Sequence, residues 1–459
     1  MKQYGAIVIG AGAAGLSVAT AAAACGVRVL LLDRDDGSNS DFAKSGGAAA
    51  AAGTSFQASA GVVDSPAIWT SDIKGKTGGR FESSIVQLVT TRARDAIHFQ
   101  ADRLKIPLHL VEGIPVAGHS VPRLYGTPRE VGREYAQMLK AAAGQWPAIT
   151  RIDGAEVTGL IVEKDRVEGV RAQHGYATQI YRAPFTVLCS GGFAANRTML
   201  AQFIPEMAEA LYIGCPFNDG RALTWARELG ASWDFLDSYQ GHGHVTADTR
   251  GRLGLGLTTL GAILVNREGR RFVKEDIGPS ELAAYVQAAP GGYAVEVYDQ
   301  SIHHVALQMG AYAEAIRRGA AVFASSVDAL ADALSIPPAN LKETIETANR
   351  AALGETPDPL HRKDFAKPLS PPFWAVKIVG ALAHTQGGLL VDQHARVLRR
   401  DGSAIQGLLA AGGTVTGISG HGAAGYSSGN GLAQAFALGL IAAETLSYQT
   451  CAGLQSKPD

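Results

Sequence analysis

The sequence predicts an α/β fold with two domains. At the N-terminus, a short apolar strand, a glycine turn, an alanine-rich helix and a second strand follow one another over residues 4–33. Two further apolar strands, within 186–197 and 407–417, each run into a Gly-Gly turn, and a long apolar helix follows the second. Strands that alternate with helices are typical of α/β folds. The length of 459 residues exceeds what one simple core organises.

The first of these segments has the glycine spacing of a nucleotide-binding turn. Its glycines are Gly10, Gly12 and Gly15, and Asp33 ends the second strand. Gly10 permits the turn, Gly12 lets the backbone approach a pyrophosphate, and Gly15 lets the helix pack on the strand. The helix N-terminus offers unpaired N–H groups to phosphate, and Asp33 can accept hydrogen bonds from ribose hydroxyls. A Rossmann-type domain is therefore predicted.

The same apolar stretch has an alternative interpretation as a signal or membrane segment. One lysine precedes it, and the run breaks into strand, turn, helix and strand, so we expect no membrane span. Hydrophobic residues make up 46% of the chain and the net charge is −1, which fits a soluble enzyme. Nucleic-acid binding is not expected, because it needs a basic surface.

Cysteine usage points to a reduced, cytoplasmic compartment. The four cysteines lie far apart and form no CxxC pair, haem-attachment motif or iron–sulfur spacing. No metal site is predicted. The cysteines are Cys25, Cys189, Cys215 and Cys451.

The later segments favour FAD over NAD as the nucleotide. The order of "TVLCSGGFAANR", "GLLAAGGTVTG" and the final helix returns the C-terminus to the nucleotide-binding domain, as in the FAD-binding half of a two-domain flavoprotein. No second GxGxxG implies a separate NAD(P)H domain. Besides the three glycines and Asp33, the candidate FAD-binding residues are Ala13, Ala14, Arg34, Lys44, Ser45, Gly46, Gly47, Ser190, Gly191, Gly192, Asn196, Gly412, Gly413, Ser428, Asn430, Gly431 and Leu432.

Six segments, in the same order across nearly the whole chain, carry a family resemblance: "GAGAAGLSVA", "SGGAAAAAGTS", "LCSGGFAANR", "GAILVNREGRRFVKE", "HTQGGLLVD" and the final glycine-rich loop. With them the chain resembles the fumarate reductase/succinate dehydrogenase flavoproteins, including the 3-ketosteroid dehydrogenases. The resemblance implies an α+β cap (substrate) domain over 233–374, inserted into an FAD-binding domain over 1–232 and 375–459. It implies non-covalent FAD, because Ala43, Lys44 and Ser45 stand where membrane-bound members carry a flavin-linking histidine.

The resemblance also locates the substrate site. Fumarate reductases of this family hold a dicarboxylate with two histidines and two arginines, and a third arginine donates the proton. The histidines match His242 and His384, whereas His303 stands in "YDQSIHHV", where the proton-donating arginine is expected. Near "FVKEDIGPS", Glu275 matches the acid of the family's proton relay, but its arginine partner is absent.

The loop "GHGAAGYSSGNG" (420–431) has no arginine to bind a carboxylate and offers Tyr426 instead. A buried dicarboxylate without arginine partners faces a large desolvation cost, so such a substrate is not expected. Tyr426 suits a ketone oxygen, and the loop is similar to that of the 3-ketosteroid dehydrogenases. Donors at that oxygen stabilise enolate charge. The resemblance to that loop implies the Tyr426 hydroxyl and the Gly429 N–H as the oxyanion donors.

Four residues are candidates for the base that takes the proton α to the ketone: Tyr125 in "PRLYGTP", His242, His303 and His384. A histidine near its normal pKa suits proton transfer at neutral pH. The alternative for each is a packing role. For His303 it is a place on a surface helix, because "SIHHVALQMGAYAEAIRR" has an amphipathic pattern. The turn "REGRR" (267–271) is expected to be solvated.

The leading hypothesis is an FAD-dependent dehydrogenase that introduces a double bond α,β to the ketone of a cyclic or steroid-like substrate, with the β hydrogen passing to the flavin as hydride. The alternative is a reductase of an activated C=C bond, such as an enone or enoate. A flavin-binding electron carrier or scaffold without turnover is a third possibility. Oxygen, a quinone or a soluble carrier are all consistent as the external electron acceptor.

Overall fold

The computed structural model of the chain describes residues 4–112, 116, 118–129, 131–253, 256–365 and 367–455, with 449–455 as backbone alone. They form two compact units. Unit 1 takes the chain up to Ile204, Gly214–Gln240 and the chain from His384 onward, and unit 2 consists of Pro205–Ile213 and Gly241–Ala383. These boundaries differ from the expected cap of 233–374. Residues near 233 stay with unit 1 because β12 (Trp233–Asp234) pairs with β18 (Gly388–Leu389).

Unit 1 is built on a nine-stranded sheet in the order β6-β2-β1-β10-β20-β8-β7, with β19 beside β20 and β9 beside β8. The strands from β6 to β20 run parallel to their neighbours. β1, β2 and β10 are buried throughout, as expected for parallel strands covered on both faces. The predicted α/β fold is confirmed. The strands span Ala6–Ile9 (β1), Val29–Leu32 (β2), Ile149–Ile152 (β6), Ala155–Glu163 (β7), Arg166–His174 (β8), Ala177–Arg182 (β9), Thr186–Leu188 (β10), Arg396–Leu398 (β19) and Ala404–Ala410 (β20).

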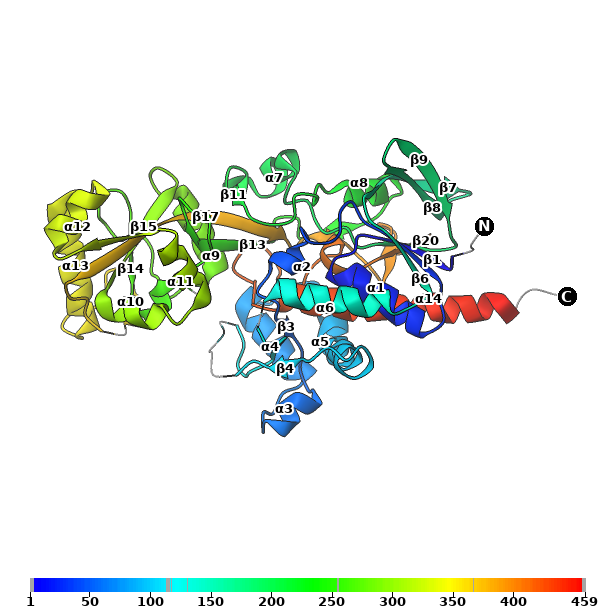
Figure 1. Cartoon of the computed structure of the whole chain (residues 1–459), viewed down its shortest axis with the longest axis horizontal. Helices are drawn as coiled ribbons and strands as arrows, with labels where there is room; N and C mark the ends of the chain where they lie inside the picture. Colours follow the sequence, from blue (N-terminus) through cyan, green and yellow to red (C-terminus); the bar gives the residue numbers. More distant parts are fainter. Residues whose placement is uncertain are drawn as a thin grey trace. The chain divides into compact units, whose positions relative to one another are not determined.

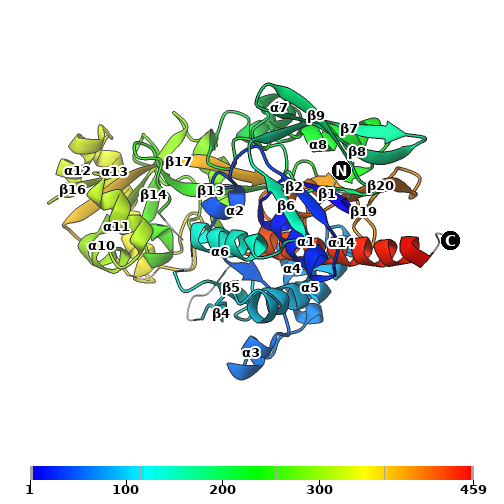
Figure 2. The same ribbon diagram turned by 45° about the vertical axis from the view of Figure 1, so that its right-hand side comes forward.

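Two alanine-rich helices, α1 (Ala13–Ala24) and α14 (Asn430–Gln455), pack against each other in unit 1 (Figure 1). The α1 residues from Ala13 to Ala23 are all buried, so this helix is covered on every side. A side chain at Gly439 of α14 would meet the Ser17 Cβ at 2.7 Å, so the two helices approach closely. Figure 2 shows the two helices in a turned view, with α6 (Gly132–Gly144) beside α1.

Unit 1 also contains a three-stranded sheet of order β3-β5-β4, and its helix α5 packs against α14. The strands are β3 (Ala49–Ala50), β4 (His109–Leu110) and β5 (Leu124–Gly126), and the helices are α2 (Asp41–Lys44), α3 (Ser55–Ser59), α4 (Pro66–Thr77), α5 (Ser83–His98), α7 (Arg197–Phe203) and α8 (Arg221–Glu228). Among the helices that the structure describes, none has the length and apolar character needed to cross a membrane.

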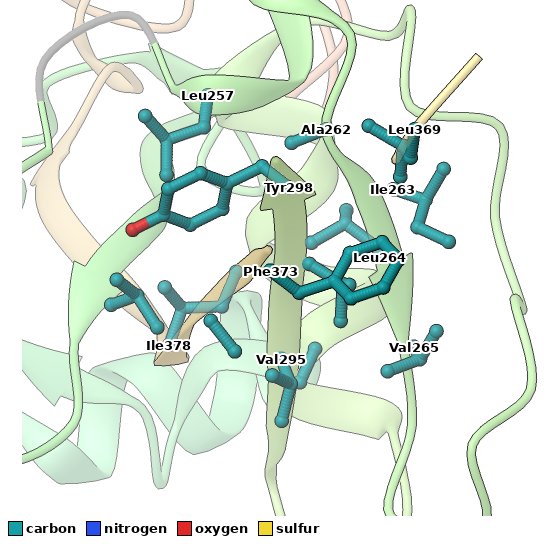
Figure 3. Packing of buried hydrophobic residues seen from close by; sticks show 14 of the residues in the cluster. Leu257, Ala262, Ile263, Leu264, Val265, Val295, Tyr298, Leu369, Phe373 and Ile378 are labelled. Atoms are coloured by element: carbon teal, nitrogen blue, oxygen red, sulfur yellow. The ribbon is translucent and has the colours of Figure 1, made fainter. Parts of the chain in front are cut away.

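Unit 2 contains most of a six-stranded sheet in the order β11-β17-β15-β14, with β13 and β16 also paired to β17. Its strands are β11 (Leu211–Tyr212), β13 (Tyr239–Thr246), β14 (Ile263–Val265), β15 (Tyr293–Asp299), β16 (Ala321–Ala324) and β17 (Phe373–Thr385). Its helices are α9 (Pro279–Ala288), α10 (Gln300–Ala306), α11 (Gly310–Arg317), α12 (Val327–Leu334) and α13 (Pro338–Ala352). Aliphatic and aromatic side chains from β14, β15 and β17 form its core together with side chains from the helices α9 to α13 and from the connecting segments. Figure 3 shows part of this cluster around Leu264 and Tyr298.

The alternation of "QGHGHV" in β13 (Gln240 to Val245) has a structural reason. A Cβ at Gly241 would lie 2.5 Å from that of Ala283, and one at Gly243 would lie 2.7 Å from the Leu282 Cγ. The glycines therefore let α9 lie directly against this face of the strand. Successive residues of a strand point to opposite faces, so His242 shares the other face with the residues two positions away from it.

Candidate functional site

Three glycine-containing turns meet at the carboxyl edge of the parallel sheet in unit 1. The first joins β1 to α1, where a Cβ on Gly15 would lie 1.7 Å from the carbonyl oxygen of Gly10. The second and third follow β10 and β20, and a Cβ on Gly413 would lie 3.6 Å from the Cα of Gly191. Gly412 lies against Ala14 of α1. Parallel sheets of this kind bind ligands at this edge.

The N-terminus of α1 has the features of a phosphate site. Gly12 is its N-cap residue, no side chain caps the helix, and its first turn has no acidic residue. Of the described atoms, the Ser40 Cβ at 3.9 Å would be the nearest to a Cβ on Gly12, so space adjoins this backbone. The helix therefore presents N–H groups and its positive end to an anion.

Asp33 adjoins this turn at the end of β2. Its carboxylate accepts hydrogen bonds from the backbone N–H groups of Ala11 and, at 3.0 Å, Asp35. Burial raises the pKa of Asp33, and the two N–H groups oppose that rise. A carboxylate held beside the glycine turn is placed as a ribose hydroxyl acceptor would be.

The predicted FAD-binding residues Lys44 to Gly47, at the end of α2 and directly after it, also belong to unit 1. The Lys44 ammonium donates to the carbonyl of Gly214 at 2.6 Å, and the Ser45 hydroxyl accepts from the N–H of Gly47 at 3.0 Å. A Cβ on Gly47 would lie 2.6 Å from the Gly132 nitrogen, so this turn packs on the start of α6, while Gly46 is exposed.

Two further predicted cofactor residues, Arg34 and Asn196, have side-chain partners within the protein. The Arg34 guanidinium pairs with Asp219 at 2.8 Å and Glu156 at 3.4 Å. Asn196 caps α7 and donates to the carbonyl of Asp219 at 2.9 Å. These contacts give both residues a structural role. If either residue also binds FAD, its side chain must do so while it keeps these contacts.

Asn430, at the start of α14, is the strongest indication that a polar ligand binds at this place. Its side chain is 1% exposed, and neither its Nδ2 nor its Oδ1 has a hydrogen-bond partner among the described residues. A buried amide without partners is costly, so such a group needs an explanation. Gly431 and Leu432 follow it at the positive end of α14. A ring with polar edges, such as a flavin, fits this donor and acceptor pair.

Replacing Asn430 by leucine is expected to separate cofactor binding from stability. The FAD Kd should rise about 10- to 100-fold through lost hydrogen bonds, while the apoprotein Tm stays level or rises because an unsatisfied amide is removed. Gln434→Leu is the matched control, because the Gln434 side chain is buried but donates to the carbonyls of Gly412, Val415 and Thr416. That variant should lower the apoprotein Tm. Fluorescence titration measures the FAD Kd of each variant, and thermal melting measures the apoprotein Tm. A marked fall in the apoprotein Tm of Asn430→Leu would contradict the assignment of Asn430 to FAD binding.

Unit 1 brings two of the candidate catalytic side chains together. The rings of Tyr426 and His384 lie 6.2 Å apart between centroids and nearly perpendicular, at 88°. His384 Nε2 lies 2.7 Å from the Gln240 Oε1 and 3.4 Å from the Gln386 Nε2. The shorter contact is to an oxygen that only accepts, and it favours the tautomer with the proton on Nε2. A Cβ on Gly431 would lie 3.2 Å from the His384 Cε1, which places the imidazole at the N-terminus of α14.

Gly429, the other candidate oxyanion donor, immediately precedes α14 in the left-handed region at φ 84°. A Cβ there would lie 2.6 Å from the Leu124 Cδ2 and 2.9 Å from the Ala50 nitrogen. The carbonyl of Gly429 accepts from the N–H of Ala50 at 3.3 Å. The loop before α14 is thus held against β3 and β5.

Tyr125 is fully buried on β5, with its hydroxyl hydrogen-bonded to Thr54 and its ring against Phe56. Burial raises the pKa of Tyr125 despite the Thr54 contact. This position favours packing over the predicted role of a base.

The other two candidate histidines belong to unit 2. Burial holds the pKa of His242 well below its usual value, and the nearby Arg252 and His244 act in the same direction. His244, on the same face of β13, is itself buried, and its Nδ1 contacts the buried Glu296 carboxylate at 2.5 Å. The His244–Glu296 pair was missed in the sequence. The histidines at alternate positions in "QGHGHV" were the available signal.

His303 is buried, so the surface alternative for it was wrong. Its ring stacks on Trp374 at 3.8 Å, and its Nδ1 lies 2.7 Å from the Tyr312 hydroxyl. Burial lowers its pKa. The predicted amphipathic helix is two helices, α10 and α11. His303 is thus packed within unit 2 on aromatic side chains.

The expected solvated turn "REGRR" was also wrong for its last residue. Arg271 is nearly buried and makes paired contacts to Glu275 at 2.7 and 2.8 Å, with Asp358 as a second carboxylate partner. Arg362 lies 3.3 Å from Glu275. Glu275, proposed above as a proton-relay acid, is therefore enclosed by two arginines that belong to the same unit.

Among the described residues, no group of histidine, cysteine and acidic side chains could hold a metal ion. Among the described side chains, Cys25, Cys189 and Cys215 form no disulfide bond. Cys451 lies outside the described side chains. Burial raises the pKa of Cys215 to about 12 and that of Cys189 further.

The sequence is similar to that of known flavoproteins. The chain matches the family described as FAD binding domain over residues 5–432. It is 28% identical to a probable fumarate reductase, Ifc3, of Shewanella frigidimarina, over 95% of this chain and 74% of the relative. It is 24% identical to 4-oxocyclohexanecarboxylate 2-dehydrogenase of Sinomonas cyclohexanicum, over 98% of this chain and 93% of the relative.

Solved structures share the fold. The open conformation of a flavocytochrome c3 fumarate reductase matches with a TM-score of 0.84 at 24% identity, over 97% of this chain and 78% of the other. The 3-ketosteroid-Δ4-(5α)-dehydrogenase of Rhodococcus jostii matches with a TM-score of 0.77 at 23% identity, over 97% of both chains.

Proposed function

Because the chain belongs to the FAD binding domain family and is related to fumarate reductase flavoproteins, we propose that this FAD-dependent oxidoreductase desaturates a cyclic ketone next to its carbonyl. The observation that carries the proposal is the pair of Tyr426 and His384, whose rings meet at the N-terminus of α14 beside a loop without arginine. A donor and a base at one place are what removal of a proton α to a ketone requires.

Each residue has a role in this proposal. The Tyr426 hydroxyl and the Gly429 N–H donate to the ketone oxygen and stabilise the negative charge that develops there. His384, with Nε2–H donating to Gln240, has Nδ1 as its basic nitrogen, which takes the α proton. Bound FAD supplies the acceptor for the hydride that leaves the β carbon. The products are an enone, a protonated His384 and reduced cofactor, which an external acceptor such as oxygen, a quinone or a soluble carrier reoxidises.

In this proposal, FAD is held by residues at the carboxyl edge of the parallel sheet in unit 1. Gly10, Gly12 and the α1 N-terminus would bind the pyrophosphate, Asp33 a ribose, and Asn430 with the start of α14 the flavin. The chain has Ala43, Lys44 and Ser45 before the first Gly-Gly, so we propose non-covalent binding.

A reductase of an activated C=C bond is the second candidate. The 28% identity to a probable fumarate reductase favours it, as does the presence of a histidine at 242 and at 384. Both candidates use the same proton and hydride positions in opposite directions, so kinetics must separate them.

An anaerobic titration tests the proposal. The oxidised enzyme is mixed with cyclohexanone, 4-oxocyclohexanecarboxylate and saturated 3-ketosteroids, and the visible flavin absorbance is followed. We expect one ketone to bleach the flavin and the matching enone to appear by mass spectrometry. If no ketone bleaches it while fumarate or an enone rapidly reoxidises chemically reduced enzyme, the reductase replaces the dehydrogenase.

A further inference from the structure

A buried ionic cluster lies in unit 1 against the loop that carries Tyr426 and Gly429. Its centre is Arg123, whose side chain is 0% exposed. Arg123 contacts both carboxylate oxygens of Asp64, from Nε at 3.0 Å and from Nη2 at 3.1 Å, and Asp72 from Nη1 at 2.6 Å. Two carboxylates around a planar guanidinium hold it in one orientation.

The cluster determines the tautomer of His119. The Arg123 Nη1 lies 3.4 Å from the Nδ1 of His119, and a guanidinium can only donate, so Nδ1 accepts. The His119 Nε2 then carries the proton and donates to the carbonyl of Ser428 at 2.9 Å. The ring is neutral in this arrangement. Burial lowers the pKa of His119, Arg123 acts in the same direction, and the Ser428 contact and the two aspartates oppose it.

The segment that carries His119 is packed on the same loop. Gly118 is in the left-handed region, and a Cβ there would lie 2.3 Å from the Ser427 Oγ. One segment thus contacts Ser427 through its backbone and Ser428 through an imidazole. Gly429 is held from its other side, where its carbonyl accepts from Ala50.

The Ser428–Gly429 peptide connects this contact to the chemistry. In a trans peptide, the carbonyl of one residue and the N–H of the next point in opposite directions. A donor that fixes the Ser428 carbonyl therefore also fixes the direction of the Gly429 N–H. Among the described residues, the Gly429 N–H has no backbone acceptor. A ligand acceptor could therefore bond this N–H.

We propose that His119 is a positioning residue. By donating from Nε2 to the Ser428 carbonyl, with its tautomer set by the Asp64–Arg123–Asp72 cluster, it aims the Gly429 N–H at the substrate oxygen. This inference rests on the proposed function for its chemistry, but its geometry stands on unit 1 alone. A donor that is oriented before substrate binds needs no reorganisation during the reaction.

Two substitutions separate positioning from packing. His119→Phe keeps the ring but removes the donor, and kcat for the ketone should fall about 10- to 100-fold with little change in KM, because small misplacement of a donor acts on the transition state. His119→Gln places an amide nitrogen near the position of Nε2 and should recover most of kcat. Equal losses in both variants, or a loss confined to KM, would overturn the proposal.

His98→Phe is the matched control, because this unit 1 imidazole also bonds a backbone group, the Ser55 N–H at 3.3 Å, away from the α14 loop. Its kcat should equal that of the unmodified enzyme. Flavin content and Tm of all three variants show whether each is folded. If His119→Phe is unfolded, the decision rests on the Gln variant and on the spectroscopic measurement below.

Nitrogen NMR of ¹⁵N-histidine holoenzyme tests the contact without turnover. The signals of His119, assigned by their loss in His119→Gln, should be those of a neutral ring protonated at Nε2 at pH 7. An imidazolium, or a ring protonated at Nδ1, would overturn the inference. If no ketone reduces the flavin of the unmodified enzyme, the proposed function fails, and this NMR result still decides whether His119 holds Ser428 as described.

Discussion

Tyr426→Phe is expected to lower kcat for ketone oxidation about 100- to 1000-fold, which corresponds to roughly 2.7–4 kcal/mol of transition-state stabilisation. The hydroxyl is the side-chain donor proposed for the developing enolate, and its ring lies beside the proposed base His384. Phenylalanine keeps the ring, so the packing of the loop should survive. The flavin-to-protein ratio and the visible spectrum should be unchanged. Stopped-flow reduction of the flavin by the ketone gives the rate directly.

Tyr176→Phe is the control for this experiment, because Tyr176 is fully exposed on the turn between β8 and β9. In Tyr176→Phe, the ketone should reduce the flavin at the same rate as in the unmodified enzyme. Flavin reduction by Tyr426→Phe within a factor of about three of that rate would remove Tyr426 from the oxyanion site. A loss of flavin in Tyr426→Phe would instead indicate that the residue supports the cofactor.

Alanine substitutions at Gly12 and Gly15 should fail in different ways. At Gly12, where φ is negative and the nearest described atom to a Cβ is 3.9 Å away, the apoprotein should fold with an unchanged Tm. Its FAD Kd should rise about 100-fold or more, because the added methyl group separates the pyrophosphate from the backbone. At Gly15, a Cβ would lie 1.7 Å from the Gly10 carbonyl oxygen, which is backbone and cannot move aside.

Gly15→Ala should therefore lower the apoprotein Tm as well as FAD binding, with a cost of about 1–3 kcal/mol or more from overpacking. Calorimetry of the two apoproteins and FAD titration distinguish the effects. A Gly12→Ala protein with normal FAD affinity would show that the pyrophosphate does not approach this turn. A Gly15→Ala apoprotein as stable as the unmodified one would contradict the close packing of α1 on β1.

The parts of the fold that follow from local spacing could be predicted. Gly10, Gly12 and Gly15 act within one turn, so their spacing in the sequence is enough to predict a strand, a turn and a helix. The structure has β1, α1 and β2 in the predicted order. The Gly-Gly turns after β10 and β20 were found for the same reason. The boundaries of the inserted unit were less accessible, because the β12–β18 pairing joins residues far apart in the chain.

Much of the candidate site depends on such distant pairs. Arg123 contacts Asp64 and Asp72, which lie 59 and 51 positions away in the sequence. The local segment "GHSVPR" contains no pattern that predicts these partners. The partner of Arg271, Asp358, is 87 positions away, so five adjacent residues with three arginines gave the pattern of a solvated turn. A charged residue in a sequence shows its charge, but its burial depends on a partner that only the fold supplies.

The orphaned amide of Asn430 has a consequence for the amount of active protein. A ligand that binds the folded chain alone stabilises it by RT ln(1 + [L]/Kd), about 2.7 kcal/mol at a hundredfold excess over Kd. Because FAD would satisfy a group that the empty chain leaves buried and unpaired, cofactor supply and folding yield are linked by mass action. Cells starved of riboflavin should therefore accumulate less of this protein as well as less of its activity, with the deficit arising through proteolysis of unfolded chains.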